Sequence, residues 1–285
     1  MVKPADGRPR VLISSMGRSG STWLADLLNA ERKYKIVFEP FFPARVEAAS
    51  SFGYYRYLNI EQYSKELLPV AATIFGGEID NEWVNTLNHD NHHSKNILVK
   101  SIRSNLMLEW INHHFPLMKI ILLVRDPFQV AQSWVKLGWG NIPKSEMSDL
   151  ETILSQESLL SDFPEIKDLA RYFQPEGAFE SAVLEWSILN HVPLKQAKRG
   201  KVSLLLVNYN DIIANPIIEL RRIFSFIESD FAENEILEKF SKRSITSFTK
   251  HKGSLGLTDK IRDKCLSILD SLNDTNLRHF ISSSN

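Results

Sequence analysis

Short apolar runs alternate along the chain with longer segments in which apolar residues recur at helical spacing. The runs are continuous in Val, Ile and Leu, and they lie at 10–15, 35–38, 96–100, 119–124 and 201–207. Uninterrupted runs of this kind are typical of parallel β-strands that are buried on both faces. We therefore predict five strands of one parallel sheet.

Helices are predicted between these strands. Trp23, Leu24, Leu27 and Leu28 share one face of a first helix. Further helices are predicted at 104–114, 127–138, 177–199 and 216–228, and another within 257–282. The alternating order of strands and helices predicts an α/β fold, with a central parallel sheet flanked by helices and joined by right-handed crossovers.

Two segments, 45–95 and 140–176, are less regular and carry aromatic, polar and proline residues. We expect a single domain spanning 1–285, in which these segments cover the substrate at the edge of the sheet. The alternative is that they are packed irregular structure without a role at the site.

Composition and charge exclude several classes of protein. The chain has 285 residues, with 34 Lys and Arg against 34 Asp and Glu. A zero net charge argues against a general nucleic-acid-binding protein, although it allows a local basic pocket. The single cysteine, Cys265, excludes an internal disulfide framework and a cysteine-cluster metal site. No signal peptide and no membrane span are predicted, so we expect a cytoplasmic protein.

The most informative segment is SSMGRSGSTW, residues 14–23, which joins the first predicted strand to the first helix. Its small residues allow backbone N–H groups to surround an anion, and the helix adds the positive end of its dipole. Ser19, Ser21 and Thr22 add hydroxyl donors, and Arg18 adds a fixed positive charge. The alternative is a purely structural turn between strand and helix.

A comparison with the nucleoside triphosphate loop GxxxxGK[ST] narrows the class of anion. Gly20 and Thr22 match its last glycine and its hydroxyl residue, but Ser21 stands in place of its lysine. Without that lysine the β- and γ-phosphates lose their principal cation. A magnesium-dependent kinase is therefore disfavoured, and Arg18 suits an anion smaller than a triphosphate.

A second candidate anion site follows the strand predicted at 119–124. Arg125 leaves the carboxyl end of that strand, where ligands bind in open α/β sheets. Asp126 and Pro127 predict the start of the next helix, and Ser133 lies within it. Arg125 and Ser133 are expected to converge on a second phosphate.

Together these segments resemble the sulfotransferases that use 3′-phosphoadenosine 5′-phosphosulfate (PAPS). GRSGSTW is similar to their 5′-phosphosulfate loop, and RDPFQVAQS to their 3′-phosphate element. Two weaker similarities follow: NYNDIIANP resembles the family's Tyr-Glu-Asp-Leu segment, and HKGSLG its late Lys-Gly-x-x-Gly loop. The resemblance implies a P-loop-like three-layer fold, PAPS as donor, adenosine 3′,5′-bisphosphate (PAP) as product, and no metal.

The resemblance also implies roles for individual residues. The residues that it places at the 5′-phosphosulfate are Gly17, Arg18, Ser19, Gly20, Ser21 and Thr22. Those that it places at the 3′-phosphate are Arg125 and Ser133, with Lys252 and Gly253 closing over the same group. Trp23 is implied to stack on adenine and Tyr209 to contact its edge; for both, the alternative is a structural role.

Transfer to a hydroxyl requires a base, and here the chain departs from the cytosolic branch of the family. That branch has Lys-Thr-His with a base His, whereas this chain has Lys100, Ser101 and Ile102. Lys100 is expected to reach the bridging oxygen or the sulfuryl group, unless it is a solvated strand end.

Glu39 is the better candidate base. It follows a predicted strand in a Phe-Glu-Pro sequence that resembles the carbohydrate and protein sulfotransferase branches, some of which use a Glu base. A carboxylate in an apolar pocket can have its pKa raised toward neutrality. The alternatives are that Glu39 only pairs with a neighbouring cation, or that a histidine acts as base, among His89, His92 and His93.

We therefore expect an enzyme that transfers a sulfuryl group in line from PAPS to a hydroxyl of a carbohydrate-like or other small molecule. Arg18 stabilises the leaving phosphate and Glu39 accepts the proton. The rivals are a magnesium-dependent kinase or phosphotransferase of the same fold and an inactive nucleotide-binding module. The aromatic residues that can line an acceptor cleft are Tyr54, Tyr55, Tyr57 and Trp139. Neither the acceptor nor the oligomeric state can be assigned from the sequence.

Overall fold

The structure is a computed structural model that describes residues 10–61, 65–88, 94–139, 148–248, 258–272 and 275–282, without the side chains of 242–248. Five residues of interest lie outside the described residues: Lys252, Gly253, His89, His92 and His93. Their expected roles stay predictions.

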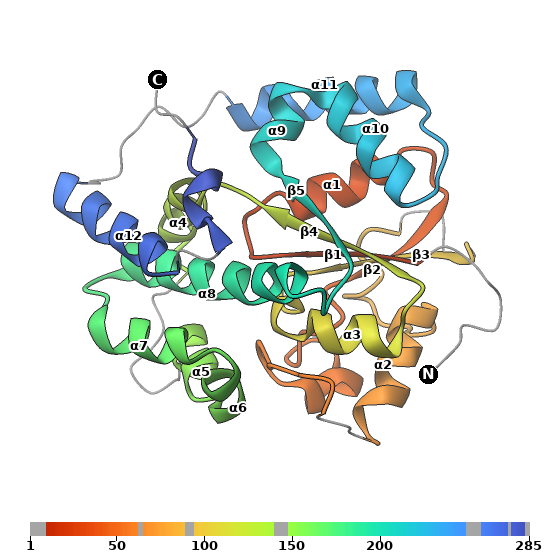
Figure 1. The fold of residues 1–285 in the computed structure, drawn as a ribbon. Helices are drawn as coiled ribbons and strands as arrows, with labels where there is room; N and C mark the ends of the chain where they lie inside the picture. Colours follow the sequence, from red (N-terminus) through yellow and green to blue (C-terminus); the bar gives the residue numbers. More distant parts are fainter. Residues whose placement is uncertain are drawn as a thin grey trace.

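A five-stranded parallel sheet forms the centre of the molecule (Figure 1). Its strands are β1 (Arg10–Ser15), β2 (Tyr34–Phe38), β3 (Asn96–Ser101), β4 (Met118–Val124) and β5 (Leu204–Asn208). The order is β2-β3-β1-β4-β5, so β1 is central, and Leu12 pairs with both Val99 and Ile120. The predicted α/β fold is confirmed, although β5 begins at Leu204 rather than at 201.

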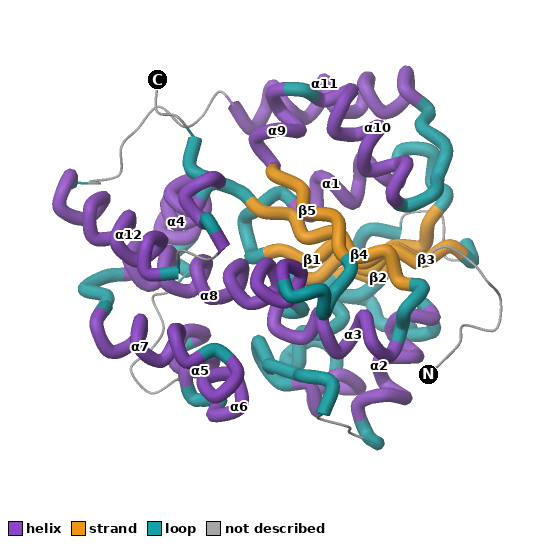
Figure 2. Tube along the Cα trace, viewed as in Figure 1, coloured by secondary structure: helices purple, strands orange, loops and turns teal. Residues whose placement is uncertain are grey.

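One face of the sheet is covered by α1 (Ser21–Leu28), α9 (Tyr209–Ala214), α10 (Pro216–Phe226) and α11 (Glu233–Phe248) (Figure 2). Successive strand residues point to opposite faces. Val11 and Ile13 therefore pack in the same cluster as Leu24 of α1, whereas Leu12 belongs to the cluster on the other face.

The opposite face is covered by α2 (Leu67–Gly76), α3 (Leu108–His114), α4 (Pro127–Lys136), α8 (Ala178–Lys198) and α12 (Asp259–Ser271). Three short helices lie beside α8: α5 (Asp149–Leu154), α6 (Glu157–Asp162) and α7 (Pro164–Tyr172). The 3-10 turns are η1 (Glu47–Phe52), η2 (Asn105–Met107) and η4 (Leu277–Phe280). Helices on both faces make the expected three layers.

At α4 a local cap agrees with the apolar period that predicted the helix. Asp126 caps α4 by accepting hydrogen bonds from the amides of Phe128 at 2.8 Å and Gln129 at 3.2 Å. The helix predicted over 104–114 instead begins with the η2 turn.

The segments 45–95 and 140–176 contain α2, α5, α6 and α7, which their sequence pattern did not predict. Two of these helices have only six residues. Fewer than two turns are too short to establish a period, so such helices depend on tertiary packing. None of the helices in the described ranges combines the length and apolar composition that a membrane span needs.

Candidate active site

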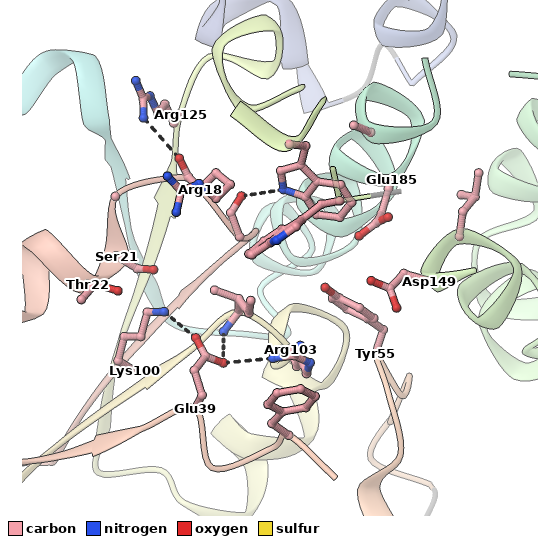
Figure 3. A pocket seen from close by; sticks show the side chains of 18 of the residues that line it. Arg18, Ser21, Thr22, Glu39, Tyr55, Lys100, Arg103, Arg125, Asp149 and Glu185 are labelled. Carbon is pink, nitrogen blue, oxygen red and sulfur yellow. Dashed lines mark hydrogen bonds and ion pairs between the residues drawn. The ribbon is translucent and has the colours of Figure 1, made fainter. Parts of the chain in front are cut away.

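The predicted site residues within the described ranges lie at one edge of the sheet, where the parallel strands have their carboxyl ends. Figure 3 shows Arg18, Ser21, Thr22, Glu39, Lys100 and Arg125 there. The phosphate loop follows β1, Glu39 follows β2, and Lys100 lies near the end of β3. Arg125 follows β4 and Tyr209 follows β5. All of these elements contribute to the lining of one cavity of about 880 Å³.

The loop between β1 and α1 has a backbone that requires glycine at position 20. Gly20 has a φ of 94°, and a Cβ there would lie 2.6 Å from the ring of Tyr209. The loop is also held by the indole of Trp134, which donates to the main-chain oxygen of Gly17 at 3.2 Å. Ser21 and Thr22 form the first turn of α1, where N–H groups lack partners within the helix.

The two predicted anion sites are in direct contact. Nη1 of Arg125 donates to the main-chain oxygen of Arg18 at 3.2 Å, and Nε of Arg18 donates to the hydroxyl of Ser133 at 2.9 Å. In the described part of the chain neither guanidinium forms an ion pair with a carboxylate. Because neither is paired with a carboxylate, both cations are available to an anionic ligand. Burial lowers the pKa of Arg125 below its ordinary value.

Aromatic side chains lie beside this cationic edge. The guanidinium of Arg125 stacks over the ring of Tyr209, with its Cζ 4.5 Å from the ring centroid. The ring of Trp23 is 5.4 Å from that of Tyr209 and 5.5 Å from that of Phe240. Trp23 and Tyr209 both line the cavity, next to the two anion sites.

Ser19 lies in the same loop and is buried. Its hydroxyl has no hydrogen-bond partner among the described residues. A buried donor without a partner is unusual in proteins. Gly20 lies so close to the ring of Tyr209 that no Cβ fits between them. The unpartnered hydroxyl of Ser19 and this close approach of the backbone both fit a loop that binds an anion.

Glu39 is only 3% exposed and has a left-handed φ of 44°. One carboxylate oxygen accepts from Nζ of Lys100 at 2.5 Å. The other accepts from the amide of Ile102 at 3.1 Å and from Nη1 of Arg103 at 3.5 Å. The pairing of Glu39 with Lys100, which the sequence left as an alternative, is present in the structure.

Arg103 was not singled out by the sequence, although it follows β3 closely. Its guanidinium Cζ lies 4.0 Å from the ring centroid of Phe42, and Arg103 lines the cavity together with Glu39. Lys100 is buried as well, with Nζ 4.9 Å from the ring centroid of Phe38. Lys100 is therefore not the solvated strand end that we considered.

The far end of the cavity was also not predicted. Glu185 of α8, Asp149 of α5 and Tyr55 line it. Burial raises the pKa of Glu185 well above its usual range, and the charge of Asp149 adds to this. The one sequence signal was a glutamate inside an apolar stretch of a predicted helix, where a charged residue is rarely buried without a reason.

Of the aromatic residues proposed for the acceptor cleft, Tyr55 and Trp139 line the cavity. Tyr57 is buried elsewhere, and its hydroxyl donates to Asp162 at 2.6 Å. Tyr54 is among the exposed side chains. Cys265 is buried in the core, and this burial raises the pKa of its thiol to about 12.

Comparisons with known proteins identify a family. A family model described as a sulfotransferase domain matches residues 8–272. Nodulation protein NoeE of Sinorhizobium fredii is 25% identical over 221 residues, which are 75% of this chain and 48% of that protein. The chain thus spans about half the length of this curated relative.

The fold also occurs among solved structures. A sulfotransferase domain from the olefin synthase of Synechococcus PCC 7002 aligns with a TM-score of 0.50 at 18% identity, covering 99% of both chains. This similarity supports the assignment of the fold.

Proposed function

Because the chain belongs to the sulfotransferase domain family, we propose that it transfers a sulfuryl group from PAPS to a hydroxyl of a small-molecule or carbohydrate-like acceptor. The observation that carries this proposal is the contact of Arg18 with both Arg125 and Ser133. It brings two anion-binding groups to the same edge of the sheet, as a nucleotide with phosphate groups on both its 3′ and 5′ oxygens requires.

In this proposal PAPS binds along the contact between Arg18, Arg125 and Ser133. Gly17, Arg18, Ser19, Gly20, Ser21 and Thr22 hold its 5′-phosphosulfate, and Arg125 and Ser133 hold its 3′-phosphate. Trp23 and Tyr209 contact the adenine. The adjacent positions of these two rings support this role, since their centroids are 5.4 Å apart. Lys252 and Gly253 are proposed to close over the 3′-phosphate.

The proposed reaction is a single in-line displacement. The acceptor oxygen forms a bond to sulfur while the bond between sulfur and the 5′-phosphate oxygen breaks, and the acceptor proton passes to Glu39. The products are the sulfated acceptor and PAP. Negative charge grows on the departing phosphate oxygen, and Arg18 stabilises that charge as a preorganised donor.

Lys100 links the base to the phosphate loop in this mechanism. Its ammonium donates to Glu39 at 2.5 Å and lies on the side of Ser21 in Figure 3. We propose that Lys100 shares its hydrogen bonds between Glu39 and the bridging oxygen. When the proton arrives on Glu39, the ion pair is weakened and Lys100 is released toward the leaving group.

We further propose that 1–285 form a single domain and that 45–95 and 140–176 cover the acceptor. Tyr55 and Trp83 from the first segment line the cavity, as do Asp149 and Leu150 from the second. A cover of this kind excludes water from the reacting groups and strengthens their electrostatic interactions.

Calorimetry and a turnover assay test the proposal. We expect PAP to bind without magnesium and a labelled sulfuryl donor to transfer its label to an acceptor. Binding of ATP that depends on magnesium, without binding of PAP, would instead indicate the kinase. Binding of PAP with no transfer to any acceptor in a broad panel of hydroxyl compounds would indicate an inactive nucleotide-binding module.

A further inference from the structure

Two carboxyl groups enter the cavity on the side away from the phosphate loop. Glu185 projects from α8 and Asp149 from the first turn of α5, and in Figure 3 both point into the space beside Tyr55. Arg18, Ser21, Thr22 and Arg125 lie on the opposite side of the same view. The cavity therefore has a cationic end and an acidic end.

Within the described residues, the two carboxyl groups of the acidic end have no ion-pair partner, although the charge of Arg103 acts on both. Glu185 is 3% exposed, and its Oε1 has no hydrogen-bond partner among the described residues. Neither Glu185 nor Asp149 forms an ion pair within the described ranges. Arg103 is the nearby cation, but its Nη1 donates to Glu39 at 3.5 Å and its guanidinium stacks on Phe42.

This arrangement is costly unless a ligand completes it. Removing a carboxyl oxygen such as Oε1 of Glu185 from water without a hydrogen-bond partner is unfavourable, and two neighbouring carboxylates repel each other when both are charged. Burial raises the pKa of Glu185 and that of Asp149, while Arg103 acts in the opposite direction on both. The glutamate also occupies a position in α8 whose neighbours Leu184 and Trp186 are core residues.

The rest of the lining is largely apolar. Phe42, Ile102, Trp134 and Trp139 contribute to it together with Tyr55. An acceptor that extends from the phosphate loop to the acidic end is therefore expected to have an apolar body between two polar ends.

We infer that Glu185 and Asp149 bind a protonated amine of the acceptor, so that the acceptor is an amino alcohol whose hydroxyl receives the sulfuryl group. An ammonium group has three N–H donors and a positive charge, so it can satisfy both carboxylates at once. A second neutral hydroxyl would supply one donor and no charge. The inference rests on the proposed function, which places the reacting hydroxyl at the other end of the cavity.

Calorimetry on the full chain with PAP bound tests this assignment, with benzylamine and benzyl alcohol as the probes. The two have nearly the same size, and only the amine carries a charge at neutral pH. We expect benzylamine to bind at least about tenfold more tightly, as a charge-assisted hydrogen bond predicts. In Glu185→Gln we expect the two affinities to agree within about threefold.

Glu180→Gln is the matched control. Glu180 is a second buried glutamate of α8, but it is paired with Lys264 at 2.7 Å and is not among the cavity residues. This variant is expected to keep the preference for the amine. If Glu185→Gln does not fold, Asp149→Asn is tested in its place, because Asp149 is only partly buried and its substitution should disturb the fold less. Asp149→Asn must then cause the same loss of preference for the amine.

The outcomes separate this inference from the proposed function. A chain that binds PAP but shows equal affinities, or no binding of benzylamine, overturns the amine site and leaves the sulfotransferase proposal intact. An unchanged preference in Glu185→Gln overturns it as well. A chain that binds no PAP overturns both.

Discussion

Arg125 donates a hydrogen bond from Nη1 to the main-chain oxygen of Arg18 at 3.2 Å, although the two residues follow different strands. The bond joins the loop after β1 to the end of β4, which pairs with β1 in the sheet. Each anion-binding group is thereby held in place by the other, and this arrangement has measurable consequences.

Arg18→Ala is expected to lower kcat by roughly 10²–10³-fold, the loss seen when one preorganised donor to a developing negative charge is removed. PAP binding should fall much less, because Arg125 donates to the main-chain oxygen of residue 18, which the substitution keeps. Initial rates with labelled donor measure the effect. The control is Arg56→Ala, an exposed arginine that donates to Ser51. Near-normal turnover in Arg18→Ala would remove Arg18 from the mechanism.

Arg125→Ala is expected to reduce the discrimination between PAP and adenosine 5′-monophosphate. Loss of a charge-assisted hydrogen bond should weaken PAP binding by roughly 10–100-fold. Binding of the monophosphate should hardly change, because it has no 3′-phosphate, and it serves as the internal control. Equal losses for both nucleotides in calorimetry would show that Arg125 supports the site as a whole rather than that phosphate.

Gly20→Ala is expected to destabilise the fold and to reduce PAP binding, because its Cβ would meet Tyr209 at 2.6 Å. Gly200→Ala is the matched control. Gly200, just after the end of α8, also has a positive φ, 71°, but a Cβ there meets nothing within 4 Å. Backbone strain alone should cost that variant about 1–2 kcal/mol. Urea unfolding of both variants measures the difference, and equal costs would contradict the proposed clash.

Glu39→Gln is expected to lower kcat by roughly 10²–10⁴-fold with PAP binding retained, as for loss of a general base. It also leaves Lys100 buried without its carboxylate, which should cost about 3–5 kcal/mol of stability. Adding Lys100→Met removes the stranded charge, so the double variant should recover stability but not activity. Unchanged kinetics in the single variant would place the base elsewhere.

Protonation of Glu165 is expected to contribute to unfolding of the protein in acid. Burial by itself would raise its pKa, but hydrogen bonds from His191 and Lys195 outweigh this and hold the pKa at about 2, against an ordinary 4.5. Its stabilising effect is therefore complete above pH 4.5 and is lost as the pH falls toward 2.

Glu165→Gln tests this contribution. The difference in unfolding free energy between wild type and variant should be larger at pH 7 than at about pH 3. Glu47→Gln, at an exposed position, should show no such change. A difference that does not vary with pH would mean that Glu165 contributes through packing alone.

The local sequence was sufficient to predict those features of the fold and the site that depend only on residues close together in the chain. The five strands are continuous apolar runs, and the loop from Gly17 to Thr22 combines its small residues, hydroxyls and cation within one stretch. The cap of α4 is also local, since Asp126 reaches the amides of Phe128 and Gln129. Parallel strands then bring the segments that follow them to one edge of the sheet.

Tertiary structure alone decided which groups face each other. Glu39 was recognised as a possible base, but its bonds to Lys100, Ile102 and Arg103 depend on the pairing of β2 with β3. Glu185 and Asp149 carry no common motif, and they meet because α5 packs on α8. The charge of a side chain and the period of a helix depend on residues that are close in the sequence. The burial of a side chain and its electrostatic partners are decided only when distant segments pack together.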